Sequence, residues 1–261
     1  MKNLHGKWAL VTGASSGLGV EFAKLFAERN ANLVLVARRT EPMEQLAEAL
    51  RKEQSVQVVV MGMDLSQPGA AAELKAQLDA RGIEVEVLVN NAGFGAYGDF
   101  LDQSVEKLGE MMRLNVMALT ELTHIFGWEM ANRGHGRVLL VASVLGYQAV
   151  PGYAAYAATK GYVLLLGEAL HQELSPRGVS VTTVSPGATA TAFSAVAGEK
   201  SSLVLKALRM KPQVVAKTAV LAAMRDKASV VPGFLNKANV FMDRLMPRSM
   251  QRMVFGRVMA G

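Results

Sequence analysis

Short apolar segments alternate with amphipathic segments along most of the chain. The short runs, each closed by polar residues or glycine, are typical of strands buried on both faces of a parallel sheet. The segments between them place apolar residues every three or four positions, as helices do. This alternation predicts an α/β protein with a doubly wound parallel sheet of about seven strands and helices on both faces. The predicted strands are 8–12, 33–37, 56–63, 85–89, 138–142, 179–184 and 229–231.

One domain over residues 1–261 is expected, because no internal repeat or linker interrupts the pattern. Two segments lack the alternation. Residues 193–211 are rich in Ala, Ser, Gly and Lys, which suits a lid over a substrate, and residues 242–261 form a basic tail rich in methionine. The predicted helices are 20–29, 40–52, one from Ser66 to near Gly82, a long one over 104–132, one through Tyr156 and Lys160 to Ser175, and 212–226.

Composition removes several classes of function. The 261 residues are 51% hydrophobic and 19% charged, which is ordinary globular usage. The absence of cysteine excludes disulfides, thiolate catalysis and cysteine-ligated zinc, and the four histidines show no metal-ligand spacing, so no metal is expected. No apolar run is long enough to span a bilayer and the N-terminus lacks the apolar core of a signal peptide, so we expect a cytoplasmic protein.

The net charge of +6 is concentrated in the last quarter of the chain. From Glu199 onward there are 12 Lys or Arg against 3 Asp or Glu. A solvated face explains this asymmetry, and attraction to an anionic substrate handle, a carrier or a lipid surface is the alternative.

A glycine-rich turn follows the first predicted strand. Gly13, Gly17 and Gly19 carry no Cβ, so backbone N–H groups and the positive end of the next helix can approach a pyrophosphate. The second strand ends in Arg38 and Arg39, where a dinucleotide fold meets the adenosine ribose. An acidic residue would bond a free 2′-hydroxyl there, whereas arginine meets a 2′-phosphate. The sequence therefore favours NADP(H), with NAD(H) the weaker alternative.

Four polar side chains in the later segments suggest proton transfer. Tyr156 and Lys160 lie one helical turn apart, and an ammonium beside a phenol, together with a positively charged nicotinamide, is expected to lower the phenol pKa toward a usable range. Ser143, at the end of the fifth strand, can hold the substrate oxygen beside Tyr156. Asn115 lies in an apolar stretch and could anchor a water that relays a proton from Lys160.

In their order and approximate spacing, these motifs resemble those of the short-chain dehydrogenase/reductase family, in its single-domain form with a Rossmann-like fold. The resemblance covers residues 7 to 192 and includes Asn90-Asn-Ala-Gly93, Pro186-Gly187 and Thr191. Ala142 and Thr159 depart from the usual pattern, but neither change removes a reacting group. The resemblance implies that Asn115, Ser143, Tyr156 and Lys160 are catalytic and that the cofactor is held by Gly13, Ser15, Ser16, Gly17, Leu18, Gly19, Arg38, Arg39, Asp64, Leu65, Asn91, Ala92, Gly93, Tyr156, Lys160, Pro186, Gly187, Thr189 and Thr191.

Within this set the resemblance assigns different parts of the cofactor. Residues 13 and 15–19 would line the phosphates, Asp64 and Leu65 would meet the adenine, and Asn91 to Gly93 would lie along the adenosine. Tyr156 and Lys160 would bond the nicotinamide ribose, and Thr189 and Thr191 would hold the carboxamide.

The expected activity is hydride transfer between NADP(H) and a ketone or secondary alcohol. An apolar pocket built from Phe94, Val144, Leu145, Tyr147, Pro151, Tyr153 and Phe193 suits a 3-oxoacyl chain, a steroid or another bulky carbonyl. A non-catalytic NADP(H) sensor or scaffold is the alternative from another class.

The expected partners are a small-molecule substrate and further copies of the chain. The apolar surface of helices 104–132 and 153–174 predicts a homodimer or homotetramer. No nucleic-acid partner is expected. Attachment of the tail to a membrane surface is disfavoured, because its apolar side can equally pack on a neighbouring subunit.

Overall fold

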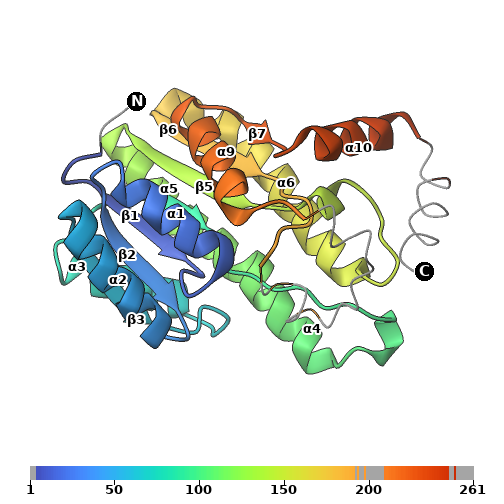
Figure 1. Ribbon diagram of the computed structural model, residues 1–261, viewed down its shortest axis with the longest axis horizontal. Coiled ribbons are helices and arrows are strands. Elements are labelled where there is room, and N and C mark those ends of the chain that lie inside the picture. Colours follow the sequence, from blue (N-terminus) through green and yellow to red (C-terminus); the bar gives the residue numbers. More distant parts are fainter. Residues whose placement is uncertain (1–3, 192, 194–196, 198–208, 247–249, 251–261) are drawn as a thin grey trace.

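The computed structural model describes residues 4–191, 193, 197, 209–246 and 250 (Figure 1). Seven strands form one parallel sheet in the order β3-β2-β1-β4-β5-β6-β7, which confirms the predicted doubly wound architecture. The strands are β1 (Trp8–Thr12), β2 (Asn32–Ala37), β3 (Val58–Gly62), β4 (Val85–Asn90), β5 (Gly136–Val141), β6 (Val179–Val184) and β7 (Ser229–Val230).

Helices cover both faces of the sheet. The core on one face joins the buried sides of α1, α2 and α9 to the strands, with Phe22 and Phe26 among its fully buried side chains. The core on the other face joins α3, α5 and α6, with Phe126 at its centre. The helices are α1 (Gly17–Ala27), α2 (Glu41–Gln54), α3 (Ala70–Asp79), α4 (Val105–Met112), α5 (Leu119–Arg133), α6 (Ala154–Leu174), α9 (Pro212–Met224) and α10 (Phe234–Leu245).

The strand order reverses between β1 and β4, and this reversal positions the site. Chain segments leave β1 and β4 toward opposite sides, so a crevice opens at the carboxyl ends of these two neighbouring strands. Thr12 closes the crevice floor: its hydroxyl donates to the Val89 carbonyl (3.2 Å) and accepts from the backbone N–H groups of Asn91 and Ala92 (3.0 Å each).

Two elements differ from the sequence expectation. The long helix predicted over 104–132 is present as continuous helical backbone, but a π-helical segment, η2 (Arg113–Ala118), which contains Asn115, separates α4 from α5. The helix α10 was not predicted at all, and Figure 1 shows it at one end of the molecule, apart from the helices that cover the sheet. In the described part of the chain, no helix is long and apolar enough to cross a membrane.

The predicted lid and tail lie largely outside the described residues. Of the lid, only Phe193, Ala197 and residues 209–211 are described, and of the tail only 242–246 and Met250. The ends of the lid segment are nonetheless joined, because Met210 donates to the Ala188 carbonyl and accepts from the Ala190 N–H, at 2.9 Å each.

Candidate active site

A cavity of about 930 Å³ occupies the crevice at the carboxyl ends of the strands. It runs from the glycine-rich turn after β1 to the side chains of Ser143, Tyr156 and Lys160. All of the predicted cofactor residues except Gly19 line it, as do three of the four predicted catalytic residues; Asn115 is the exception. Each set thus includes one residue that does not reach the cavity wall.

The turn between β1 and α1 has the shape that a phosphate requires. Gly13 and Gly17 both adopt positive φ, at 66° and 58°. A Cβ on Gly13 would lie 2.8 Å from Asn91 Nδ2, and one on Gly17 would lie 3.1 Å from Thr191 Cγ2. Ser16, before the first turn of α1, makes no side-chain capping bond, so that turn can offer its N–H groups to an anion. These features fit a dinucleotide pyrophosphate.

Gly19 was predicted to line the phosphates, but it does not line the cavity. It lies inside α1, and a Cβ there would collide with the Gly13 carbonyl oxygen. Its missing side chain therefore lets the helix pack against the turn, and the residue stays away from the cavity wall.

The arginines at the end of β2 face the adenosine end of the cavity. Arg39 Nη2 lies 3.4 Å from Ser15 Oγ, a geometry that leaves both groups beside the turn. Arg38 Nη1 donates to Glu110 Oε1 on α4 at 2.8 Å. Glu110 is therefore a site residue that the sequence did not reveal, because the pair spans 72 residues.

Asp64 lies on the same wall, beyond β3. Burial raises the pKa of its carboxyl, but hydrogen bonds from Ser66 and Gln67 and the charge of Arg38 outweigh this and hold the pKa below its usual value. Asp64 is thus an anion that orders its own turn, and Leu65 beside it is buried and lines the cavity.

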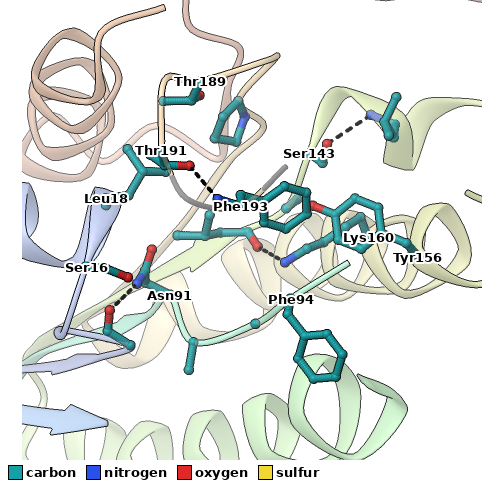
Figure 2. Close-up of a pocket in the computed structure, with 18 of the residues that line it drawn as sticks. Ser16, Leu18, Asn91, Phe94, Ser143, Tyr156, Lys160, Thr189, Thr191 and Phe193 are labelled. Carbon is teal, nitrogen blue, oxygen red and sulfur yellow. Dashed lines mark hydrogen bonds between the residues drawn. The ribbon is translucent and has the colours of Figure 1, made fainter. Parts of the chain in front are cut away.

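Tyr156, Ser143 and Lys160 come together at the other end of the cavity (Figure 2). Tyr156 and Lys160 lie on α6, and both are almost fully buried. Ser143 follows β5, lines the same cavity and accepts a hydrogen bond from the Leu145 N–H at 3.2 Å. Lys160 Nζ donates to the Val141 carbonyl at 2.7 Å and lies 5.8 Å from the centre of the Tyr156 ring.

Burial affects the ionisation of both Tyr156 and Lys160 in the protein without its cofactor, so a lowered phenol pKa beside a bound nicotinamide stays a prediction. Burial raises the pKa of the phenol, and the hydrogen bond with Ser143 offsets only part of that rise. Burial also lowers the pKa of Lys160 to about 8. Without a bound cofactor, burial therefore favours the protonated form of the Tyr156 phenol, which can act as a proton donor.

A protonated phenol beside a hydroxyl and a phosphate-binding turn is the arrangement expected of a dehydrogenase. The model of the short chain dehydrogenase family matches residues 7–202 of the sequence. The chain belongs to this family.

Known members of the short chain dehydrogenase family resemble the chain in sequence and in structure. Ketoacyl reductase HetN of Nostoc sp. is 32% identical over 187 residues, which make up 72% of this chain and 65% of that protein, so the match spans less than two thirds of the relative. A short-chain dehydrogenase from Sphingobium yanoikuyae, solved in complex with NADPH, is 32% identical with a TM-score of 0.80, covering 92% of this chain and 96% of that one. A solved 7β-hydroxysteroid dehydrogenase has a TM-score of 0.88 at 27% identity and covers 98% of this chain and 100% of its own.

Asn115, which the sequence predicted to be catalytic, is fully buried and lies behind the cavity wall. Its amide accepts from Phe94 N (3.1 Å) and donates to Phe94 O (2.9 Å) and to Thr159 Oγ1 (3.2 Å). Thr159 in turn donates to the Tyr156 carbonyl at 2.7 Å. Asn115 therefore ties η2 to α6 and to the loop after β4, and its water-relay role stays a prediction.

The apolar end of the cavity contains most of the predicted pocket residues. Phe94, Val144, Leu145, Tyr153 and Phe193 line it, whereas Tyr147 and Pro151 do not. The Phe193 ring lies beside the Tyr156 ring, with 5.3 Å between the centroids (Figure 2). The sequence did not predict several further lining residues, which come from the segments before α9 and at the start of α10: Met210, Gly233, Phe234, Leu235, Asn236 and Asn239.

In the part of the chain that the structure describes, no cluster of three or more His, Asp or Glu side chains could hold a metal ion.

Proposed function

We propose that the chain catalyses the NADPH-dependent reduction of a bulky apolar ketone to a secondary alcohol. One observation carries the proposal: the buried Tyr156, with Ser143 and Lys160, shares one cavity with a phosphate-binding turn. In the direction of reduction, the Tyr156 phenol is placed to supply the proton that the carbonyl oxygen takes up.

Each residue at the reacting end has a role that its position permits. The nicotinamide, when bound, supplies the hydride to the carbonyl carbon. Ser143 hydrogen-bonds the substrate oxygen, and Tyr156 donates its proton to that oxygen as the carbon–oxygen π bond breaks. The charge of Lys160 stabilises the phenolate that this transfer leaves behind.

The choice of NADP(H) rests on Arg38 and Arg39. No carboxylate follows β2, so a free 2′-hydroxyl would lack its usual acceptor, whereas two guanidinium groups beside Ser15 can bond a phosphate. The NADPH complex of the Sphingobium relative supports the same choice. Arg38 must then exchange Glu110 for the phosphate.

The substrate class follows from the lining of the reacting end. Tyr153, Phe193, Leu145 and the α10 residues Phe234 and Leu235 give it an apolar surface, which disfavours sugars and suits an acyl chain or a steroid. A ketoacyl reductase and a 7β-hydroxysteroid dehydrogenase among the relatives support these two classes.

A panel of 3-oxoacyl thioesters, steroid ketones and small ketones, each with NADPH and NADH, tests the proposal. The Tyr156→Phe variant should lose about 10² or more in kcat and still bind NADPH, since only the proton donor is removed. Tyr162→Phe is the matched control, because this tyrosine lies on the same helix outside the cavity and pairs with Thr120. Tight NADPH binding without turnover on any ketone would instead favour the non-catalytic sensor.

A further inference from the structure

The outward side of α10 is an apolar stripe. Its large members, at spacings of one, three, four and six residues, are exposed by 51% to 83%, although side chains of this kind normally face a core. Ala238 lies among them and is also exposed. The large members of the α10 stripe are Phe234, Leu235, Phe241, Met242 and Leu245.

The opposite side of α10 is fixed to the body of the protein. Val240 and Asp243 are buried, and the Gln148 side-chain amide donates to both carboxylate oxygens of Asp243. Burial raises the pKa of Asp243, which is consistent with its place inside. Because this side is anchored next to η3 (Val144–Tyr147), the helix cannot roll to bury the α10 stripe against its own sheet.

The charges beside the α10 stripe favour one kind of partner over another. Lys237 is exposed beside it. The one acidic residue of α10, Asp243, is buried, so no acidic side chain lies on the exposed side of this helix. A twofold contact between two copies of the stripe would bring like charges together, whereas an anionic lipid surface accepts both the apolar and the basic side chains.

The geometry points to α10 as a helix that lies in the interface of an anionic lipid bilayer. The sequence disfavoured attachment of residues 242–261 to a membrane and did not predict α10, so this assignment differs from the sequence-based expectation. Phe234 and Leu235 belong both to the α10 stripe and to the cavity lining, so the bilayer contact adjoins one end of the cavity. The inference does not depend on the reaction proposed above.

Co-sedimentation of the full chain with vesicles tests the assignment. Vesicles of three parts phosphatidylcholine to one part phosphatidylserine should bind the protein, vesicles of phosphatidylcholine alone should bind it less, and added salt should weaken binding. Phe241→Ser combined with Leu245→Ser should lower the partition coefficient by about tenfold or more. Lys237→Gln should lower it about fivefold.

Matched measurements separate this result from unfolding. Phe241 and Leu245 do not line the cavity, so NADPH binding and turnover of a water-soluble ketone should persist in the double variant. Leu101→Ser is the control, because Leu101 is 92% exposed but lies in η1 (Phe100–Asp102), away from α10.

Three results would overturn the assignment. The first is no binding to the phosphatidylserine vesicles, and the second is equal loss in the Leu101 control. The third is a double variant that binds vesicles normally but loses oligomeric mass or thermal stability, which would mean that the α10 stripe is covered by a second copy or by the chain itself.

Discussion

Arg38 has two competing anionic partners, Glu110 and the 2′-phosphate of a bound cofactor. The pair with Glu110 is largely exposed, so its contribution is small, about 0.2–1 kcal/mol. We expect Glu110→Gln to raise NADPH affinity about two- to fivefold by releasing Arg38, and to leave NADH affinity unchanged. Arg38→Ala should lower NADPH affinity by about one to two orders of magnitude.

Fluorescence titration of both cofactors measures these changes. Glu106→Gln is the matched control, because Glu106 lies one turn earlier on α4 and bonds Ser104 instead. If Glu110→Gln weakened NADPH binding, Glu110 would be a positioning residue that orients Arg38, and the competition would be disproved.

Lys160 makes the free enzyme sensitive to pH near neutrality. Burial lowers its pKa to about 8, so the ammonium is present below that pH and is lost as pH rises through it. Because kcat/KM for NADPH reports the free enzyme, it should fall as pH increases past about 8. A profile that stays flat well above pH 8 would show that Lys160 keeps its charge or that the charge is not needed.

At the scale of elements, the π-helical segment η2 places the side-chain amide of Asn115 in the protein interior. Asn115 is fully buried, and its three hydrogen bonds join the loop after β4 to α6. Asn115→Ala leaves the Phe94 backbone and Thr159 without these partners, which should lower the free energy of unfolding by about 1–3 kcal/mol.

Urea unfolding gives the size of this effect through a lower midpoint at constant m. Asn132→Ala, at an exposed position on α5, should change stability by less than about 0.5 kcal/mol. Activity lost by Asn115→Ala without any loss of stability would favour the proton-relay role instead.

How far the sequence predicted each element depends on the kind of signal that it carries. Strands β1 to β6 are local apolar runs, and the polar residues that end them fall at one edge of a parallel sheet, so the fold and most of the site followed from spacing. The π-helical segment η2 has no local sequence signal, because the partners of Asn115 in the structure, Phe94 and Thr159, are distant in sequence. Glu110 and α10 were missed for related reasons: one acts across 72 residues, and the other carries its apolar side outward, where a core pattern does not explain it.

The whole molecule exposes apolar side chains on α5 and α6 as well. Trp128 is 60% exposed and Leu165 is 70% exposed, although Leu164 beside it is buried. We expect these helices to pack against a second copy about a twofold axis. Leu165→Lys should place a charge in that contact and halve the mass measured by light scattering at micromolar concentration, whereas Leu101→Lys should not. A wild-type protein that is already monomeric would contradict the contact.

The hydrogen bonds of the Thr12 hydroxyl to the end of β4 also constrain the order in which the protein can fold during synthesis. The bond of Thr12 to Val89 closes a loop of 77 residues, and β1 lacks a neighbour on that side until β4 exists. During synthesis, β1, β2 and β3 can pair while one edge of β1 stays open, and such an edge invites pairing with other chains. The part of the cavity beside the glycine-rich turn can form once the Asn91 and Ala92 N–H groups bond to Thr12. The part that contains Tyr156 and Lys160 forms only after α6 has been synthesised. A truncated chain that ends between α3 and β4 would therefore keep this edge of β1 open to pairing with other chains.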